Sequence, residues 1–142
     1  MFDKNIFGER FFQWNCDSER YETIADWACD RVAGCDQVAL EGYAFGAKGQ
    51  RLFQIAENTG ILKYKLFNLN IPIEIVPPGT VKKLATGKGN ADKQQMHSAF
   101  IRSNGIDLKR MISPDQKDIS NPVSDIIDSY YICKHLYDKV IV

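Results

Sequence analysis

The feature that most constrains the fold is an alternation of short apolar runs and longer amphipathic segments in the first half of the chain. The runs have strand-like density of aromatic and β-branched residues, and the segments repeat apolar residues at helical spacing. The predicted elements are a strand at residues 6–15, a helix at 18–34, a strand at 36–40, a helix at 50–67 and a strand at 71–76. This order is typical of a parallel α/β sheet with right-handed crossovers.

The second half of the chain is predicted to be helical after Pro77-Pro78 stops the third strand. Its predicted elements are a helix at residues 80–85, a glycine-containing break at 87–90, a helix at 91–103, a polar linker through Pro114 and a last helix at 122–137. With 142 residues and 44% hydrophobic content, the chain is the size of one domain, which we expect to span residues 1–142.

The charge balance excludes arguments from overall charge, because 18 basic residues face 18 acidic ones. Any nucleic-acid surface must therefore be local. No run approaches the roughly 18 apolar residues of a membrane span, which predicts a soluble, cytoplasmic protein without a membrane partner. Cys16, Cys29, Cys35 and Cys133 form no CxxC pair, so we expect reduced, mostly buried thiols.

Glu41 ends the second predicted strand, in the stretch VALEGYAFGAKGQ at residues 38–50. In open parallel sheets, functional crevices lie outside the carboxyl ends of strands. Glycines and aromatic residues follow Glu41, where a solvated turn would have polar neighbours. Two interpretations remain open from the residues alone: a carboxylate that pairs with a helix N-terminus, and a metal ligand.

Asp125 and Asp128 lie three residues apart in NPVSDIIDSYY, on one face of the last predicted helix. Their neighbours are apolar, which predicts that both carboxylates sit against the fold and need a cation, backbone donors or a divalent metal. Pro122 at the first helical position places Asp125 in the first turn, where a carboxylate can be purely structural. Together with Glu41, the pair would form an all-oxygen cluster suited to Mg²⁺ or Mn²⁺.

A basic segment, PPGTVKKLATGKGNADK at residues 77–93, carries four lysines against one aspartate. It lacks the GxxxxGK[ST] spacing of a nucleotide-binding loop. An ordinary lysine-rich surface helix would explain the charge but not the paired glycines. Lysines on helices that flank a glycine turn are placed to contact phosphates, which indicates a polyanion.

Three segments in the same order resemble the RuvC-type Holliday junction resolvases of the RNase H-like superfamily, including their phage-type variant: VALEGYAFGAKGQ, IPIEIVPPGTVKKLATGKGNADKQQM and SDIIDSYYIC. The resemblance implies a mixed sheet flanked by helices. It implies that Glu41, Asp125 and Asp128 are catalytic ligands for Mg²⁺ or Mn²⁺. It further implies a structure-selective endodeoxyribonuclease, a hydrolase for four-way or branched DNA in recombination, repair or phage DNA processing, in the cytoplasm of a bacterial or phage-infected cell.

The resemblance also implies a homodimer and a DNA-binding set. Lys82 and Lys93 would hold the scissile phosphate, and Tyr43 or Phe45 would approach unpaired bases at the crossover. The full expected DNA-binding set is Tyr43, Phe45, Lys48, Lys82, Lys83, Lys88 and Lys93.

The chain departs from the family at its start, where the family has two further strands, the first of which carries an aspartate. Asp3 and Asp17 do not follow an apolar strand. We therefore expect an N-terminally incomplete domain that lacks the first two strands, in preference to a degenerate copy or a sheet completed by a partner. The alternative function is a relative that binds branched DNA without cutting it. A nuclease for RNA–DNA hybrids or flaps is a third option, because the same carboxylates serve all these substrates.

Overall fold

The computed structural model describes residues 14–43 and 49–141, which form two compact units. Within these residues, the first unit comprises residues 14–38 and 49–73, and the second comprises residues 39–43 and 74–141. The predicted strand at residues 6–15 lies almost wholly outside the described residues. The expectation of a single domain over residues 1–142 remains a prediction.

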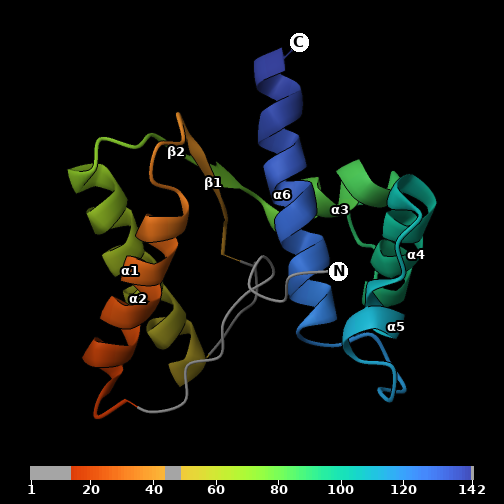
Figure 1. Cartoon of the computed structure of the whole chain (residues 1–142), viewed down its shortest axis with the longest axis horizontal. Coiled ribbons are helices and arrows are strands. Elements are labelled where there is room, and N and C mark those ends of the chain that lie inside the picture. Colours follow the sequence, from red (N-terminus) through yellow and green to blue (C-terminus); the bar gives the residue numbers. More distant parts are fainter. Residues whose placement is uncertain (1–13, 44–48, 142) are drawn as a thin grey trace. The chain divides into compact units, whose positions relative to one another are not determined.

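The first unit is built from α1 (Asp17–Arg31) and α2 (Gln50–Asn68), which pack side by side (Figure 1). Tyr21, Ala25 and Cys29 recur every four residues on α1 and are buried. Helix α2 continues through Gly60, as predicted, and Leu66 is its buried residue. Apolar burial therefore holds the two helices together.

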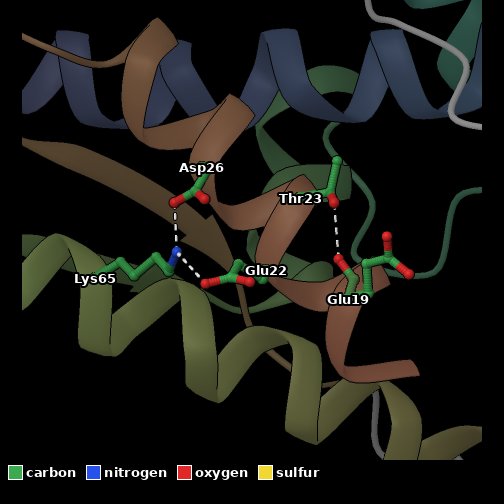
Figure 2. Close-up of polar contacts among 5 residues, drawn as sticks. All are labelled: Glu19, Glu22, Thr23, Asp26 and Lys65. Carbon is green, nitrogen blue, oxygen red and sulfur yellow. Dashed lines mark hydrogen bonds and ion pairs between the residues drawn. The ribbon is translucent and has the colours of Figure 1, made fainter. Parts of the chain in front are cut away.

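A polar contact also joins the two helices of this unit (Figure 2). The Lys65 ammonium of α2 donates a hydrogen bond to Asp26 and lies 3.7 Å from Glu22, and both acids belong to α1. The hydrogen bond to Asp26 is the main cause that raises the pKa of Lys65. Within α1, the Thr23 hydroxyl donates to the Glu19 carbonyl at 2.7 Å.

Strands β1 (Val38–Glu41) and β2 (Ile73–Val76) form a two-stranded parallel sheet within the described residues. The Val38 amide donates to Pro72 and the Gly42 amide to Val76, at 3.0 and 2.8 Å. Both pairs are 34 residues apart in the chain, and a constant separation defines parallel register. The predicted strands at 36–40 and 71–76 are thus confirmed with shifted ends.

The second unit contains α3 (Pro78–Thr86), α4 (Lys93–Asn104), α5 (Leu108–Ile112) and α6 (Val123–Ile141). Helix α6 packs against each of the other three helices (Figure 1). The largest fully buried side chains of this unit are Val76, Val81, Leu108, Val123 and Ile127. Strand β2 and all four helices contribute to the core, which fixes α6 against its neighbours.

Three local predictions are wrong. The predicted linker before Pro114 contains α5, because the Asp107 carboxylate accepts a hydrogen bond from the Arg110 amide at 3.1 Å and begins a helical turn. Helix α1 begins before Ser18, and the Glu19 carboxylate accepts a hydrogen bond from the Asn15 amide at 2.6 Å. Of the four free cysteines, only Cys29 is buried.

In the described part of the chain, no helix is long and apolar enough to cross a membrane.

Candidate active site

Glu41 is the last residue of β1, and the chain leaves the sheet at Gly42. A Cβ atom at Gly42 would lie 3.2 Å from the Ile75 Cγ2 atom and 3.6 Å from the Val76 carbonyl oxygen. A side chain at this position would have to displace the Ile75 methyl group, so glycine allows the close packing on β2. The strand partner thus explains one of the glycines that made the neighbours of Glu41 unusual.

Asp125 and Asp128 both project from the first half of α6. Asp125 lies in the first turn, as predicted, and is exposed, whereas Asp128 is half-buried. The expectation that both carboxylates sit against the fold is therefore wrong for Asp125, because the buried face of this segment is formed by Val123, Ser124 and Ile127. A residue two positions after Val123 and two before Ile127 points away from that face.

The three predicted carboxylates interact electrostatically. Desolvation, followed by the negative charges of Asp128 and Asp125, raises the pKa of Glu41. Glu41 is exposed as a whole residue, so this desolvation reflects protein atoms close to its carboxylate. Desolvation and the charge of Asp125 likewise raise the pKa of Asp128. A helix N-terminus would lower the pKa of a carboxylate, which is the opposite direction, and the role of Glu41 as a metal ligand stays a prediction.

Lysines from two other helices lie close to these acids. The charge of Lys82 opposes the rise in pKa at both Glu41 and Asp128, and Lys93 does so at Asp128. Lys82, Lys93 and Asp128 line one pocket of about 330 Å³, whose remaining lining residues are Ala91, Asp92, Met96, Ser124 and Ile127. The pocket therefore brings together the two lysines and one of the three acids that the sequence singled out.

Lys93 owes its position to the start of α4. Asp92 is the N-cap, and its carboxylate accepts a hydrogen bond from the Gln95 amide at 2.8 Å. The Gln95 side chain accepts one from the Asp92 amide at 2.9 Å, which completes a capping box. Lys93 is the first helical residue and follows directly from this cap.

The paired glycines have structural roles at the other side of the turn. Gly87 ends α3 with φ +80°, a left-handed conformation that favours glycine. A Cβ atom at Gly89 would lie 3.4 Å from the Gly79 carbonyl oxygen, so the turn packs backbone to backbone on the start of α3. Whether these backbone groups also contact phosphates stays a prediction.

Of the remaining predicted DNA-binding residues, those that the structure describes do not line the pocket. Lys83 on α3 and Lys88 in the following turn are exposed. Tyr43 follows β1 with 46% of its surface exposed. Phe45 and Lys48 lie outside the described residues. The structure therefore leaves the roles of these five residues as predictions.

Ser124 is a pocket residue that sequence reasoning missed. It is 4% exposed, and its hydroxyl lies 2.7 Å from the Asn121 side-chain oxygen and 3.5 Å from the Asp125 carboxylate. The hydroxyl donates its hydrogen bond to the Asn121 amide oxygen, as expected for a buried hydroxyl, which is usually hydrogen-bonded. The sequence does contain a signal for it, because Ser124 is a polar residue next to Val123 on an otherwise apolar helix face. Attention to the spacing of the two aspartates left this signal unused.

The donor set suits a hard divalent cation by its chemistry. Carboxylates that raise one another's pKa repel each other when ionised, and a cation that binds oxygen ligands reduces this repulsion. Among residues 14–43 and 49–141, however, no group of three or more His, Cys, Asp or Glu side chains is close enough to hold a metal ion. Glu41, Asp125 and Asp128 thus fit the ion in type, and side-chain movement would be needed to bring all three onto it.

The parallel strand pair, with helices packed around α6, gives an α/β fold of the RNase H-like type. The chain matches the solved structure of Thermus thermophilus RuvC with a TM-score of 0.66 at 14% identity, over 92% of this chain and 75% of that one. A second structure, of T. thermophilus RuvC in complex with Holliday junction substrate, matches with a TM-score of 0.67. At this identity, the likeness establishes the fold.

Several bacterial proteins named RuvC match part of the chain in sequence. The crossover junction endodeoxyribonuclease RuvC of Campylobacter concisus is 32% identical over 79 residues, which are 56% of this chain and 49% of that protein. RuvC of Prochlorococcus marinus is 27% identical over 95 residues, which are 67% of this chain and 58% of that protein. The chain spans about half the length of these relatives. No protein-family model matches. The resemblance to the RuvC-type resolvases is confirmed.

Proposed function

We propose that the chain is a structure-selective endodeoxyribonuclease that hydrolyses branched DNA, with four-way junctions as its principal substrate. The observation that carries this proposal is the electrostatic grouping of Glu41 and Asp128 beside Lys82 at one end of the sheet. The RuvC relatives, one of them solved with a Holliday junction, supply the class of substrate.

Glu41, Asp125 and Asp128 are the residues that would hold Mg²⁺ or Mn²⁺. When bound, such an ion lowers the pKa of a water molecule and stabilises the developing charge at phosphorus. Lys82 and Lys93 bind and orient the scissile phosphate, because both residues line the same pocket as Asp128. Lys83 and Lys88 extend the positive surface along the DNA backbone, and Tyr43 offers a ring on which an unpaired base can stack.

The proposal includes a homodimer, since a four-way junction presents two symmetry-related strands for cleavage. Helix α2 carries exposed aromatic side chains that could contribute apolar interface area: Phe53, Tyr64 and Phe67. Chromatography with light scattering on the whole chain gives the oligomeric state directly. A particle of twice the chain mass is expected, and a monomer at micromolar concentration with junction bound would contradict the dimer.

Cleavage assays on three labelled substrates test the proposed function. We expect the parent chain to cut a synthetic four-way junction with Mg²⁺ and to cut a flap or an RNA–DNA hybrid more slowly. Asp128→Asn removes a proposed metal ligand, and Asp138→Asn is its matched control. Asp138 pairs with Lys134 on α6 and lies in the other half of the helix from Asp128. Equal rates on all three substrates would contradict junction selectivity.

The second candidate function is binding of branched DNA without cleavage. The observation that favours it is the pocket lined by Lys82 and Lys93, because lysine contacts to phosphates do not require a metal ion. It predicts salt-dependent junction binding, with the slope of log affinity against log salt reduced by about one unit each in Lys82→Ala and Lys93→Ala. Metal-dependent turnover by the parent chain would exclude it.

A further inference from the structure

Glu74 on β2 makes a polar contact to α6 that has no role in the site described above. Its carboxylate accepts a hydrogen bond from the Lys139 ammonium and lies 3.2 Å from the His135 Nε2 atom. Side-chain exposure is 22% for Glu74, 19% for His135 and 55% for Lys139, so the His135 side of the contact is more sheltered from water than the Lys139 side. The hydrogen bond from Lys139 is the first of the causes that lower the pKa of Glu74.

The three α6 residues that face the sheet form one stripe. His135 and Lys139 lie seven and eleven residues after Asp128, and both separations are whole numbers of helical turns to within about 20°. The stripe therefore has an acidic end at Asp128 and a basic end at His135 and Lys139, about 10 and 16 Å further along the helix. Its acidic end interacts with Glu41 on β1, and its basic end contacts Glu74 on β2.

The two ends of the stripe exert opposite forces on α6. Asp128 and Glu41 repel each other, which favours separation of the helix from the sheet. The contact of Glu74 with His135 and Lys139 attracts the same helix to the neighbouring strand. The Gly42 amide of the chain after β1 donates a hydrogen bond to the Val76 carbonyl of β2 at 2.8 Å. A contact that holds α6 against β2 therefore also fixes α6 relative to Glu41 on β1.

We propose that Glu74, together with His135 and Lys139, is a positioning contact that fixes the register of α6 on the sheet and so keeps Asp128 opposite Glu41. Glu74 is a positioning residue, since it acts through α6. This role rests on the proposed function, because Glu41 and Asp128 matter to catalysis only if they are ligands.

A sliding or rotating helix would carry Asp128 and Asp125 together, so the distance between those two would not change. Only the distance from the helical pair to Glu41 would change. For that reason, we expect loss of the Glu74 contact to weaken a metal site that uses both elements. Supporting contacts around ligands of this kind typically affect metal affinity by about tenfold or more.

Glu74→Gln and Asp138→Asn, made in the whole chain, test the role. Asp138 accepts two hydrogen bonds from Lys134 within α6, at 2.9 Å each, so its loss removes an ion pair without touching the sheet. Binding of Mn²⁺ to the DNA-free protein is measured by electron paramagnetic resonance of the free ion. We expect the Kd to rise about tenfold in Glu74→Gln and less than twofold in Asp138→Asn.

An ion pair that only stabilises the fold would lower the unfolding temperature and leave the Mn²⁺ affinity of the folded protein unchanged. That result, with affinity lost in Asp128→Asn, would overturn the proposal. If Glu74→Gln does not fold, Lys139→Gln replaces it, because Lys139 is 55% exposed near the end of α6. For that variant, we expect a Kd about threefold higher, and an unchanged Kd would overturn the proposal.

Amide hydrogen exchange without metal separates this proposal from the proposed function. In Glu74→Gln, we expect exchange at residues 123–132 to accelerate about fivefold, whereas Asp138→Asn should affect only the turns around residues 134–141. Unchanged exchange at residues 123–132 would refute the positioning role. If the parent chain neither binds Mn²⁺ nor cuts DNA, the proposed function fails, and the exchange result still decides whether Glu74 fixes α6.

Discussion

Replacing Asp128 with asparagine should stabilise the metal-free protein, although it removes a proposed ligand. Asparagine has nearly the same shape as aspartate and carries no charge. The half-buried Asp128 carboxylate repels Asp125 on the same helix face and Glu41 on β1. The substitution therefore relieves repulsion and a desolvation cost in one step.

The size of the gain follows from these contacts. Like charges three or four residues apart on a helix destabilise it by about 0.2 to 0.5 kcal/mol. Asp128 also loses the attraction of Lys82 and Lys93, which offsets part of the gain from Glu41. We therefore expect the free energy of unfolding at pH 7 to rise by about 0.5 kcal/mol. The control Asp138→Asn removes a favourable pair with Lys134 and should lower it by about 0.3 to 0.5 kcal/mol.

The dependence on pH has a definite sign. The pKa of Asp128 is raised in the folded protein, so the folded state holds the proton more tightly than the unfolded state does. The destabilisation from this group therefore grows as pH rises from the unfolded-state pKa, near 3.9, through the folded-state pKa. The advantage of Asp128→Asn should accordingly be full at neutral pH and vanish below about pH 4.

Urea unfolding with and without Mn²⁺ gives a further check. If the metal binds only the folded parent chain, a hundredfold excess over its Kd adds about 2.7 kcal/mol to the parent and little to Asp128→Asn. The order of stability should then reverse. An Asp128→Asn protein that is less stable than the parent without metal, or that gains as much from Mn²⁺, would refute this account of the site.

Two further predictions concern packing and acid stability. Gly42→Ala should lower the free energy of unfolding by about 1 kcal/mol or more, because the new Cβ atom would lie 3.2 Å from the Ile75 Cγ2 atom. Gly60→Ala should raise the free energy of unfolding by about 0.5 to 1 kcal/mol, because Gly60 lies within α2 with open space around it. Equal effects of the two substitutions in urea unfolding would contradict the packing argument. The hydrogen bond from the Arg110 amide, and after it the interaction with His97, lower the pKa of Asp107. Asp107→Ala should therefore be less stable than the parent chain at pH 7, and the difference in unfolding free energy should narrow as pH falls below about 4. A difference that does not depend on pH would contradict this role of the Asp107 carboxylate.

Sequence patterns predicted α2 and the last helix well because helical periodicity is a local property. The position of Lys93 at the start of a helix could also be predicted, because Asp92 and Gln95, which cap α4, are its neighbours in the sequence. Contacts between distant residues were less accessible. Asp125 and Asp128 have similar apolar neighbours in the sequence. The packing of Val123 and Ile127 in the core leaves Asp125 exposed and Asp128 half-buried.

The Glu74 contact shows the same limit more sharply. Glu74 is 61 residues from His135, and nothing near either residue in the sequence signals their pairing. Gly42 is a related case, because its close neighbours, Ile75 and Val76, belong to β2 and lie more than 30 residues away in the sequence. In both cases the deciding neighbour comes from another element of the fold, which local patterns do not specify.

The central claim is that Asp128 supports metal-dependent hydrolysis of branched DNA. The most direct measurement is single-turnover cleavage of an end-labelled four-way junction by the parent chain, Asp128→Asn and Asp138→Asn across a Mg²⁺ titration. We predict cleavage that requires Mg²⁺ and is unchanged in Asp138→Asn. In Asp128→Asn the rate should fall by a hundredfold or more, which corresponds to a loss of about 2.7 kcal/mol or more in transition-state stabilisation. Equal cleavage by all three proteins, or junction binding by the parent chain without any cleavage, would contradict the claim.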